Sequence, residues 1–99
     1  MATVRLYIGH NSHVGENSRE KTVATLARVL QIADIDGATI YDAMGIYKGE
    51  RENTTVCVLS MLTPEQVEKV RFTVCFLLRV CLMQECIGFE VSTDKMEYI

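Results

Sequence analysis

The 99-residue sequence lacks any excess of basic residues. Ten Lys and Arg stand against 13 Asp and Glu, which gives a formal net charge of −3 at pH 7. Proteins that bind nucleic acid usually cluster basic residues on one face, because they must neutralise phosphates. The tyrosines of the predicted strands also lack the basic neighbours that a base-stacking platform would need. The composition therefore argues against a nucleic-acid ligand.

Long apolar runs are absent as well. The longest apolar segment, residues 70–83, is interrupted by Arg71, Thr73 and Arg79, whereas a membrane-spanning helix needs about 20 mostly apolar residues. The first residues, MATVRLYIG, alternate between apolar and polar instead of running apolar behind a basic start. We therefore expect neither a membrane span nor a signal peptide.

The cysteines show no C-x-x-C spacing, and the glycines form neither G-x-G-x-x-G nor G-K-[ST]. We therefore predict no metal site, no disulfide framework, no cofactor and no dedicated phosphate-binding loop. Because the four cysteines lie within apolar patterns, we interpret them as buried free thiols in a reducing compartment, which indicates the cytoplasm. They are Cys57, Cys75, Cys81 and Cys86.

Hydrophobic residues make up 48% of the chain and charged residues 23%, which is a globular composition. The length suits one domain over residues 1–99 with a single two-layered core. The segment TVRLYIG alternates like a half-buried strand. Ser18 can cap a helix that ends near DIDG. Its predicted apolar stripe comprises Val23, Leu26, Ala27, Leu30 and Ala33.

ATIYDAMGIY and TTVCVLSML predict two further strands, joined by KGEREN into a long hairpin whose turn contains Gly49 and Asn53. Gly45 within the first of these strands indicates a bulge or a bend. In TPEQ, Thr63 and Gln66 match a capping box, which predicts a helix from there to about Met83. CIGFEVS predicts the fourth strand, and the tail 93–99 could add a short extra strand.

The predicted order is strand, helix, strand, strand, helix, strand. Right-handed crossovers would place the first and third strands side by side at the centre of a four-stranded antiparallel sheet, with both helices on one face. The predicted fold class is therefore α+β, with a ferredoxin-like βαββαβ architecture.

The third strand and the second helix carry more apolar surface than one copy of this fold can bury. Val56 and Val58 point to one face of the strand while Cys57, Leu59 and Met61 point to the other, and the helix is apolar nearly all round. A patch of that size is larger than monomers normally expose. We therefore predict a homo-oligomer, with the C-terminal tail folding over the patch as the alternative. The predicted interface residues are Tyr7, Cys57, Leu59, Met61, Phe76 and Val80.

His10 and His13 lie three residues apart in the loop after the first strand. They could ligate a metal or supply a general base, but no third ligand stands at a fixed spacing and no nucleophile is identifiable. A solvated loop is therefore the preferred interpretation. Asp42 is expected to face solvent or to pair with Arg5. An anionic small molecule such as a nucleotide could still bind between subunits, and the candidate residues are Arg5, His10, His13, Lys48 and Arg51.

VRLYIGHN, followed by a helix and by GATIYDAMGIYKGERENTTVCVLSM, resembles small phage and bacterial βαββαβ proteins that begin with a YIG-N strand and carry a glycine and an aromatic-Lys-Gly-Glu at the hairpin. The chain is more loosely similar to the PII-like group. That resemblance implies the ferredoxin-like fold, a functional loop between the second and third strands, and trimers that bind nucleotides at subunit clefts.

These observations predict a small oligomeric binding or accessory protein that captures a protein partner or an anionic ligand. The resemblance to small phage proteins implies that it could be encoded by a phage. The first alternative is a PII-like nucleotide binder. The second is a small dimeric α+β barrel enzyme that uses His10 or His13 as its base.

Overall fold

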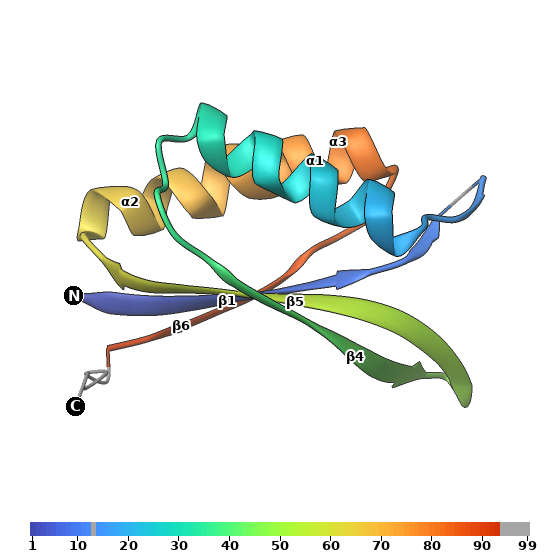
Figure 1. Cartoon of the computed structure of the whole chain (residues 1–99). Helices are drawn as coiled ribbons and strands as arrows, with labels where there is room; N and C mark the ends of the chain where they lie inside the picture. Colours follow the sequence, from blue (N-terminus) through green and yellow to red (C-terminus); the bar gives the residue numbers. More distant parts are fainter. Residues whose placement is uncertain (13, 94–99) are drawn as a thin grey trace.

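The computed structural model describes residues 1–12 and 14–93. Its main sheet has the strand order β4-β5-β1-β6 with every neighbouring pair antiparallel, and a second, two-stranded sheet joins β2 to β3. Figure 1 shows the helices together on one face of the main sheet. The elements are β1 (Ala2–Gly9), β2 (Asn11–Ser12), β3 (Gly15–Glu16), α1 (Arg19–Ile32), β4 (Thr39–Tyr47), β5 (Glu50–Leu62), α2 (Pro64–Lys69), the π-helical turn η1 (Val70–Val74), α3 (Cys75–Leu82) and β6 (Gly88–Ser92).

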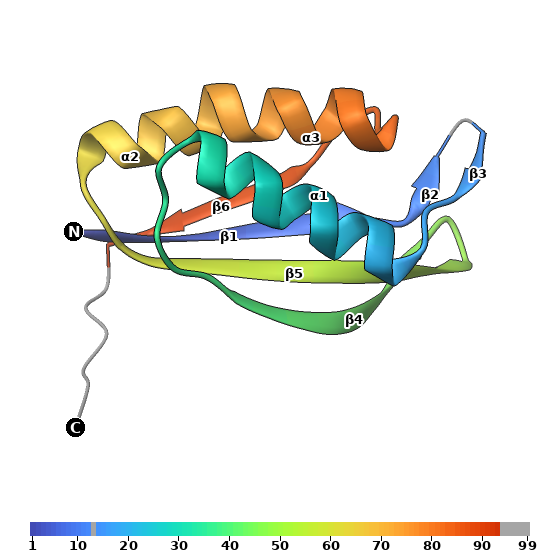
Figure 2. The ribbon, with the colours of Figure 1, turned by 45° about the horizontal axis from the view of Figure 1, so that its top comes forward.

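This architecture confirms the predicted α+β, ferredoxin-like fold. The first and third predicted strands, β1 and β5, lie side by side at the centre of the main sheet. Val4, Leu6 and Ile8 of β1 are buried beneath the helices, as their alternation predicts. The short β2–β3 pair was not predicted; it forms inside the loop that follows β1 and lies at the same end of the molecule as the β4–β5 turn (Figure 2).

Helix α1 begins at its predicted cap, where the Ser18 hydroxyl accepts a hydrogen bond from the Lys21 backbone N–H at 3.1 Å. Its buried stripe differs from the expected one, because Val29 is buried while Ala27 is exposed and Val23 is only half-buried. Thr22 is also buried, and its hydroxyl donates to the Ser18 carbonyl at 2.9 Å. That bond removes the cost of an unsatisfied hydroxyl in the core.

The second helical segment runs continuously through α2, η1 and α3. Its capping box is present in both directions, with Gln66 N–H donating to the Thr63 hydroxyl at 3.2 Å and Thr63 N–H donating to the Gln66 side chain at 2.8 Å. The segment ends at Met83, which adopts a left-handed φ of 54°. Its π turn was not predicted. The buried positions 67, 70, 74, 78 and 82 recur slightly more slowly than the turns of an α-helix, and one wide turn keeps them facing the sheet.

The β4–β5 hairpin is longer and tighter than expected. Its turn is the pair Lys48 and Gly49, both at positive φ (51° and 79°), which is the two-residue turn whose twist matches a hairpin. Residues 50–53 belong to β5 instead of the loop. The predicted bulge at Gly45 is absent, because Gly45 pairs regularly with Glu52.

The irregularity lies at the other end of β5. Between the pairs Val4–Leu59 and Ala2–Leu62, β5 has one more residue than β1, and Met61 takes a left-handed φ of 59°. This bulge lets Leu59 and Leu62 both face the helices, whereas Met61 is exposed. The expectation that Leu59 and Met61 share one face is therefore wrong.

Two of the predicted interface residues require a similar correction. Cys57 and Leu59 are fully buried in the core under the helices, so neither offers surface to a second copy. On the opposite, open face of the sheet, Val56 is also buried, because its cross-strand neighbours Tyr7 and Tyr41 flank it. The surplus of apolar side chains on β5 is thus partly hidden within one copy.

Candidate functional site

The four predicted anion-binding residues that the structure describes do not converge within one copy. Arg5 lies on the open face, where its guanidinium is 3.6 Å from the Glu90 carboxylate. His10 lies on the face that the helices cover and is 5% exposed. Arg51 pairs with Ile46 on β4, far along the hairpin, and Lys48 lies in the turn. His13 lies outside the described residues.

His10 is buried and is held in place by hydrogen bonds of its side chain and its backbone. Its Nε2 is 2.8 Å from the hydroxyl oxygen of Thr55, which is itself fully buried. The backbone N–H of His10 donates to the Asn53 carbonyl at 2.9 Å, and its carbonyl accepts from the Asn17 N–H at 2.7 Å. These bonds hold the loop that carries β2 and β3 against β5. The interpretation of His10 as a solvated loop residue is therefore wrong.

Asp42 is exposed, which was one of its two expected placements, but its ion-pair partner is not the expected Arg5. Its carboxylate is 2.7 Å from Nε of Arg19, at the start of α1, while Arg5 pairs with Glu90. The reason is the alternation of β4. Asp42 pairs with Thr55 on the side of the helices, whereas Arg5 points to the open face.

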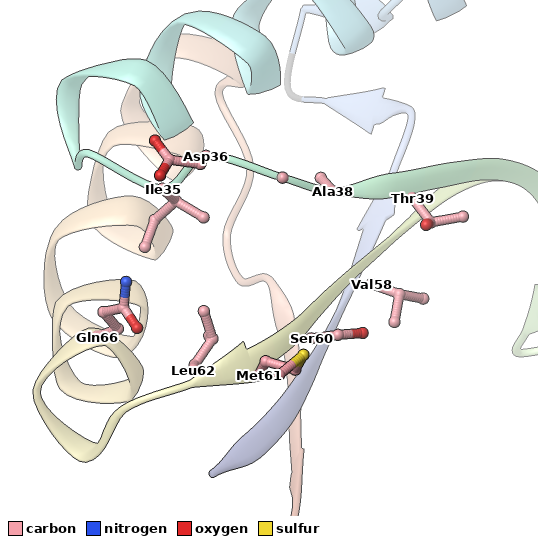
Figure 3. A pocket seen from close by; sticks show the side chains of 10 residues that line it. Ile35, Asp36, Ala38, Thr39, Val58, Ser60, Met61, Leu62 and Gln66 are labelled. Carbon is pink, nitrogen blue, oxygen red and sulfur yellow. The ribbon is translucent and has the colours of Figure 1, made fainter. Parts of the chain in front are cut away.

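Three hollows contain enough polar groups to be considered as ligand sites. The first, of about 340 Å³, lies beside the loop between α1 and β4, where Figure 3 shows the polar side chains of Asp36, Thr39, Ser60 and Gln66 among apolar ones. The second, of about 380 Å³, lies at the start of α1 and contains His10 and the Arg19–Asp42 pair. The third is the largest, at about 540 Å³, and we call it the hairpin groove. All three fall within the size range of small-molecule sites.

The hairpin groove lies over the end of β1, between the β5 strand and the segment that leads from α3 to β6. Its lining residues are Tyr7, Gly9, Asn11, Ser12, Glu52, Thr54, Met83, Gln84, Glu85, Cys86 and Gly88. Gly9 faces Thr54 across the β1–β5 pair, and Gly88 faces Tyr7 across the β1–β6 pair. Because glycine has no side chain, other side chains can lie directly over the backbone at these two positions.

Glu52 occupies the space that Gly9 leaves. A β-carbon placed on Gly9 would lie 2.6 Å from Cδ, Oε1 and Oε2 of Glu52, so the carboxylate lies directly across the β1 backbone. Oε2 accepts a hydrogen bond from the Asn11 backbone N–H at 3.0 Å. The groove therefore contains one anionic group that the main chain orients.

Tyr7 forms the aromatic wall of the groove. A β-carbon on Gly88 would lie 3.0 Å from Cβ and 3.3 Å from Cδ2 of Tyr7, so the ring extends over Gly88. The Tyr7 hydroxyl donates to Oε1 of Glu90 at 3.2 Å. Desolvation of the phenol, together with this hydrogen bond, raises the pKa of Tyr7 above its usual value. The ring is therefore neutral at physiological pH and presents an electron-rich face.

The charge of the groove has one sign. Glu52 and Glu85 line it, and no Lys or Arg is among its described lining residues. A carboxylate and an aromatic face both attract cations. Asn11, Ser12, Thr54 and Gln84 add hydrogen-bonding groups. This combination suits a ligand that has a cationic centre, a flat ring and several polar atoms.

The candidate ligand-binding residues named from the sequence did not include Glu52, Gly9 or Gly88. A usable signal was present, because a glycine within a strand often marks the close approach of another group. Cys86 also lines the groove, and both Cys81 and Cys86 are exposed, which corrects the prediction that all four cysteines are buried. Cys57 and Cys75 are buried as expected.

The described part of the chain offers neither a cluster of metal ligands nor a helix that could span a membrane. No group of three or more His, Cys, Asp or Glu side chains in residues 1–12 and 14–93 could hold a metal ion. No helix in those residues is long and apolar enough to cross a membrane.

Comparison with known proteins finds similar structures but no family to which the chain can be assigned. No family model matches the sequence, and no curated protein matches it. Among solved structures, a phage SAM lyase in complex with S-methyl-5'-thioadenosine superposes with a TM-score of 0.70 at 19% identity, over 92% of this chain and 79% of the lyase. The same kind of enzyme without ligand gives 0.65 at 20% identity, over 92% and 78% of the two chains. A de novo designed protein, Foldit4, gives 0.55 at 11% identity, over 95% and 98%. This chain is thus similar in fold to phage SAM lyases and to a designed protein.

Proposed function

We propose that this protein binds S-adenosylmethionine (SAM), or a closely related adenosyl sulfonium, in the hairpin groove and cleaves it to S-methyl-5'-thioadenosine. The observation that carries the proposal is the groove itself. It combines an oriented carboxylate, Glu52, with the exposed face of Tyr7 and has no basic side chain among its described lining residues. SAM is a sulfonium cation with a flat adenine and a polar ribose, which matches these groups. The similarity in fold to a phage SAM lyase supports the same ligand class.

The chemistry needs little from the protein. A sulfonium is a good leaving group, since the electron pair of the broken C–S bond stays on sulfur and yields a neutral thioether. The carboxylate of the same substrate can attack the γ carbon and close a five-membered lactone, so that no water, acid or external base is consumed. Two opposite charges disappear in this step, and an environment with less water than the bulk solvent favours it. The groove has to orient the substrate, and Glu52 can hold its cationic end.

A second candidate is capture of the same ligand without turnover, which retains the predicted ligand-sequestering role. Its support is that His10, the expected base, is buried against Thr55 on the other face of the sheet. A catalyst that relied on histidine would need it in the groove. Capture and cleavage share the binding site and differ in the products formed.

Binding and cleavage are tested together with purified protein. Isothermal titration calorimetry should show SAM binding at least ten-fold more tightly than S-adenosylhomocysteine, which lacks the sulfonium charge. Chromatography of the reaction should show S-methyl-5'-thioadenosine accumulating with time. Binding without that product would support capture alone. Equal affinity for the charged and neutral ligands, or no binding at millimolar SAM, would overturn the proposal.

The variant Glu52→Gln keeps the size of the side chain and an acceptor for Asn11, and we expect it to lower SAM affinity about ten-fold, equivalent to about 1.4 kcal/mol. Two matched carboxylates serve as controls. Glu50→Gln changes the same strand two residues away, and Asp36→Asn changes the hollow beside the α1–β4 loop. Both should leave affinity unchanged. A loss with Asp36→Asn alone would place the site in that other hollow.

We also propose that copies associate through the open face of the sheet. The supporting observation is that Tyr41, which flanks Val56 there and does not line the hairpin groove, remains 47% exposed. Phe76 and Val80, which were predicted for the same interface, lie on the helices, at the opposite surface of the molecule. Light scattering should give the mass of an oligomer, and Tyr41→Lys should reduce it to that of one chain. A monomeric wild-type protein at 100 µM or so would end this part of the proposal.

A further inference from the structure

A row of exposed apolar side chains runs along the outer side of the second helical segment. Phe72, Phe76 and Val80 are 67%, 53% and 59% exposed, and their spacing of four residues places them in one row on a helix surface. We call this row the helix stripe. The core of the same segment is formed by other residues, including Val70, Val74 and Leu78, which are fully buried. The helix stripe is therefore not required to close the core.

The helices carry the opposite charge from the rest of the chain. Of the ten basic and 13 acidic residues in the sequence, six basic and three acidic residues lie in α1 and in the α2–η1–α3 segment. The remaining four basic and ten acidic residues lie elsewhere, so a chain with a negative net charge has a positive helical layer. Complementary potential selects partners and raises association rates. An acidic partner is therefore favoured on this side.

Basic residues also flank the helix stripe locally. Lys69 precedes Phe72 by three residues, and Arg79 follows Phe76 by three, so both are neighbours on the helix surface. Neither forms an ion pair with a residue that the structure describes. Glu68 lies on the same segment but is paired with Arg71 at 3.5 Å. Glu65, in the first turn of α2, is the other acidic group on this segment.

The size of the helix stripe limits what can cover it. Three large side chains that are about half exposed offer on the order of 200–400 Å² of apolar surface, whereas each partner in a stable dimer buries about 800 Å². A symmetric contact between two copies would also bring the same surface patches face to face. Lys69 and Arg79 would then meet like charges. A single helix from a different protein satisfies both limits.

We propose that the helix stripe is the docking site for one amphipathic helix of a partner protein. The partner helix has apolar residues at helical spacing, which contact Phe72, Phe76 and Val80, and acidic residues on both sides of its apolar row, which pair with Lys69 and Arg79. The contact is transient because of its area. It lies on the helices, so it is independent of the hairpin groove.

The probe for this proposal is a fluorescein-labelled helical peptide of 18 residues, with Leu in one row and Glu on both sides of it. A second peptide has Lys in place of every Glu. In fluorescence anisotropy at low salt, the full-length protein should bind the acidic peptide at least ten-fold more tightly than the basic one. Phe76→Ser should weaken binding of the acidic peptide at least ten-fold. Ile32→Ser, which changes an exposed apolar residue of α1 outside the helix stripe, should have no effect.

Arg79→Glu provides a readout that a loss of stability could not imitate, because it should weaken binding of the acidic peptide and strengthen binding of the basic one. Circular dichroism of each variant shows whether the fold is retained. Equal binding of the two peptides, no binding at millimolar peptide, or insensitivity to Phe76→Ser would overturn the proposal. So would a fall in oligomer mass on Phe76→Ser, which would show that a second copy covers the helix stripe. Co-sedimentation with anionic vesicles that depends on Phe76 would assign the surface to a membrane and would equally overturn it.

Discussion

The carboxylate of Glu52 lies where the side chain of residue 9 would be if that residue were not glycine. A β-carbon on Gly9 would approach three atoms of that carboxylate to 2.6 Å, and the same carboxylate accepts the Asn11 N–H at 3.0 Å. The two residues are 43 positions apart in the sequence and belong to neighbouring strands. The position of the anionic group in the groove thus depends on the absence of a side chain on the next strand.

Gly9→Ala should therefore separate ligand binding from stability. The added methyl displaces the flexible end of Glu52 and breaks its bond with Asn11, but it touches no rigid group among the three nearest atoms. We expect the free energy of unfolding to fall by less than about 1.5 kcal/mol and SAM affinity to fall at least ten-fold. Urea denaturation and calorimetry measure the two effects. Gly37→Ala, at a position with open space, is the control, and unchanged affinity in Gly9→Ala would contradict this account of the groove.

His10→Ala should affect the fold more than the chemistry. The change removes the partner of the buried Thr55 hydroxyl, which is 2.8 Å from Nε2, and leaves a cavity beside β5. We expect the free energy of unfolding to fall by about 2–4 kcal/mol. The rate at which S-methyl-5'-thioadenosine forms, measured at a temperature where the variant is folded, should stay within three-fold or so of the wild-type rate. A variant of normal stability that had lost activity would instead restore His10 as a catalytic base.

Thr63→Ala should destabilise the chain by about 1 kcal/mol, because it removes the hydroxyl that accepts the Gln66 N–H, whereas the bond from the Thr63 backbone N–H to the Gln66 side chain does not need that hydroxyl. The helix end is distant from the hairpin groove, so ligand affinity should not change. Urea denaturation is the measurement. Thr73→Ala provides the comparison, since Thr73 is exposed within the helix, and it should be neutral or slightly stabilising. Equal losses from both variants would show that the cap is not the source of the effect.

The two buried cysteines, Cys57 and Cys75, should make the folded chain less stable at alkaline pH. Burial raises the pKa of Cys57 from 9.0 to about 12 and also raises that of Cys75. Above pH 9 the thiols lose protons in the unfolded chain that they retain in the folded chain, so their contribution to stability is constant below about pH 9 and falls as the pH rises from there toward 12. The slope for one such thiol is about 1.4 kcal/mol per pH unit. Unfolding titrations at pH 8, 9 and 10 measure this slope.

Cys57→Ala tests the origin of that slope. The variant is less stable at every pH because it leaves a cavity, but its stability should decline less steeply above pH 9. Reaction with a thiol reagent at pH 8 gives an independent check, because Cys81 and Cys86 are exposed and should react in the native protein, whereas Cys57 and Cys75 should react only after unfolding. Four equally fast thiols would be incompatible with the described core.

The sequence contained most of the information needed for the fold. Alternation in β1, the cap at Ser18 and the capping box at Thr63 are local signals, and the structure confirms each of them. The π turn and the bulge at Met61 have no comparable local signal. Both adjust the register of buried side chains against a partner element, so they depend on tertiary packing that a single segment does not reveal.

The candidate site was less predictable for a related reason. Charge and residue type drew attention to His10 and Arg5, but strand alternation places them on opposite faces of the sheet. Glu52 appeared to be one of several charges in a solvated turn, because the turn was expected to span six residues instead of two. Once the turn is limited to Lys48 and Gly49, the register of β5 brings Glu52 to the open face opposite Gly45. The error in one turn length thus concealed the site.

The alternation of β5 has one further consequence. Glu52 and Thr54 line the hairpin groove, while Asn53 and Thr55, between and after them, bond to Glu16 and His10 on the other face. A ligand that immobilises the first pair must also restrain the backbone of the second. The amide hydrogens of Glu16 and Asn17 should consequently exchange with deuterated solvent more slowly when the groove is occupied, although neither residue lines the groove.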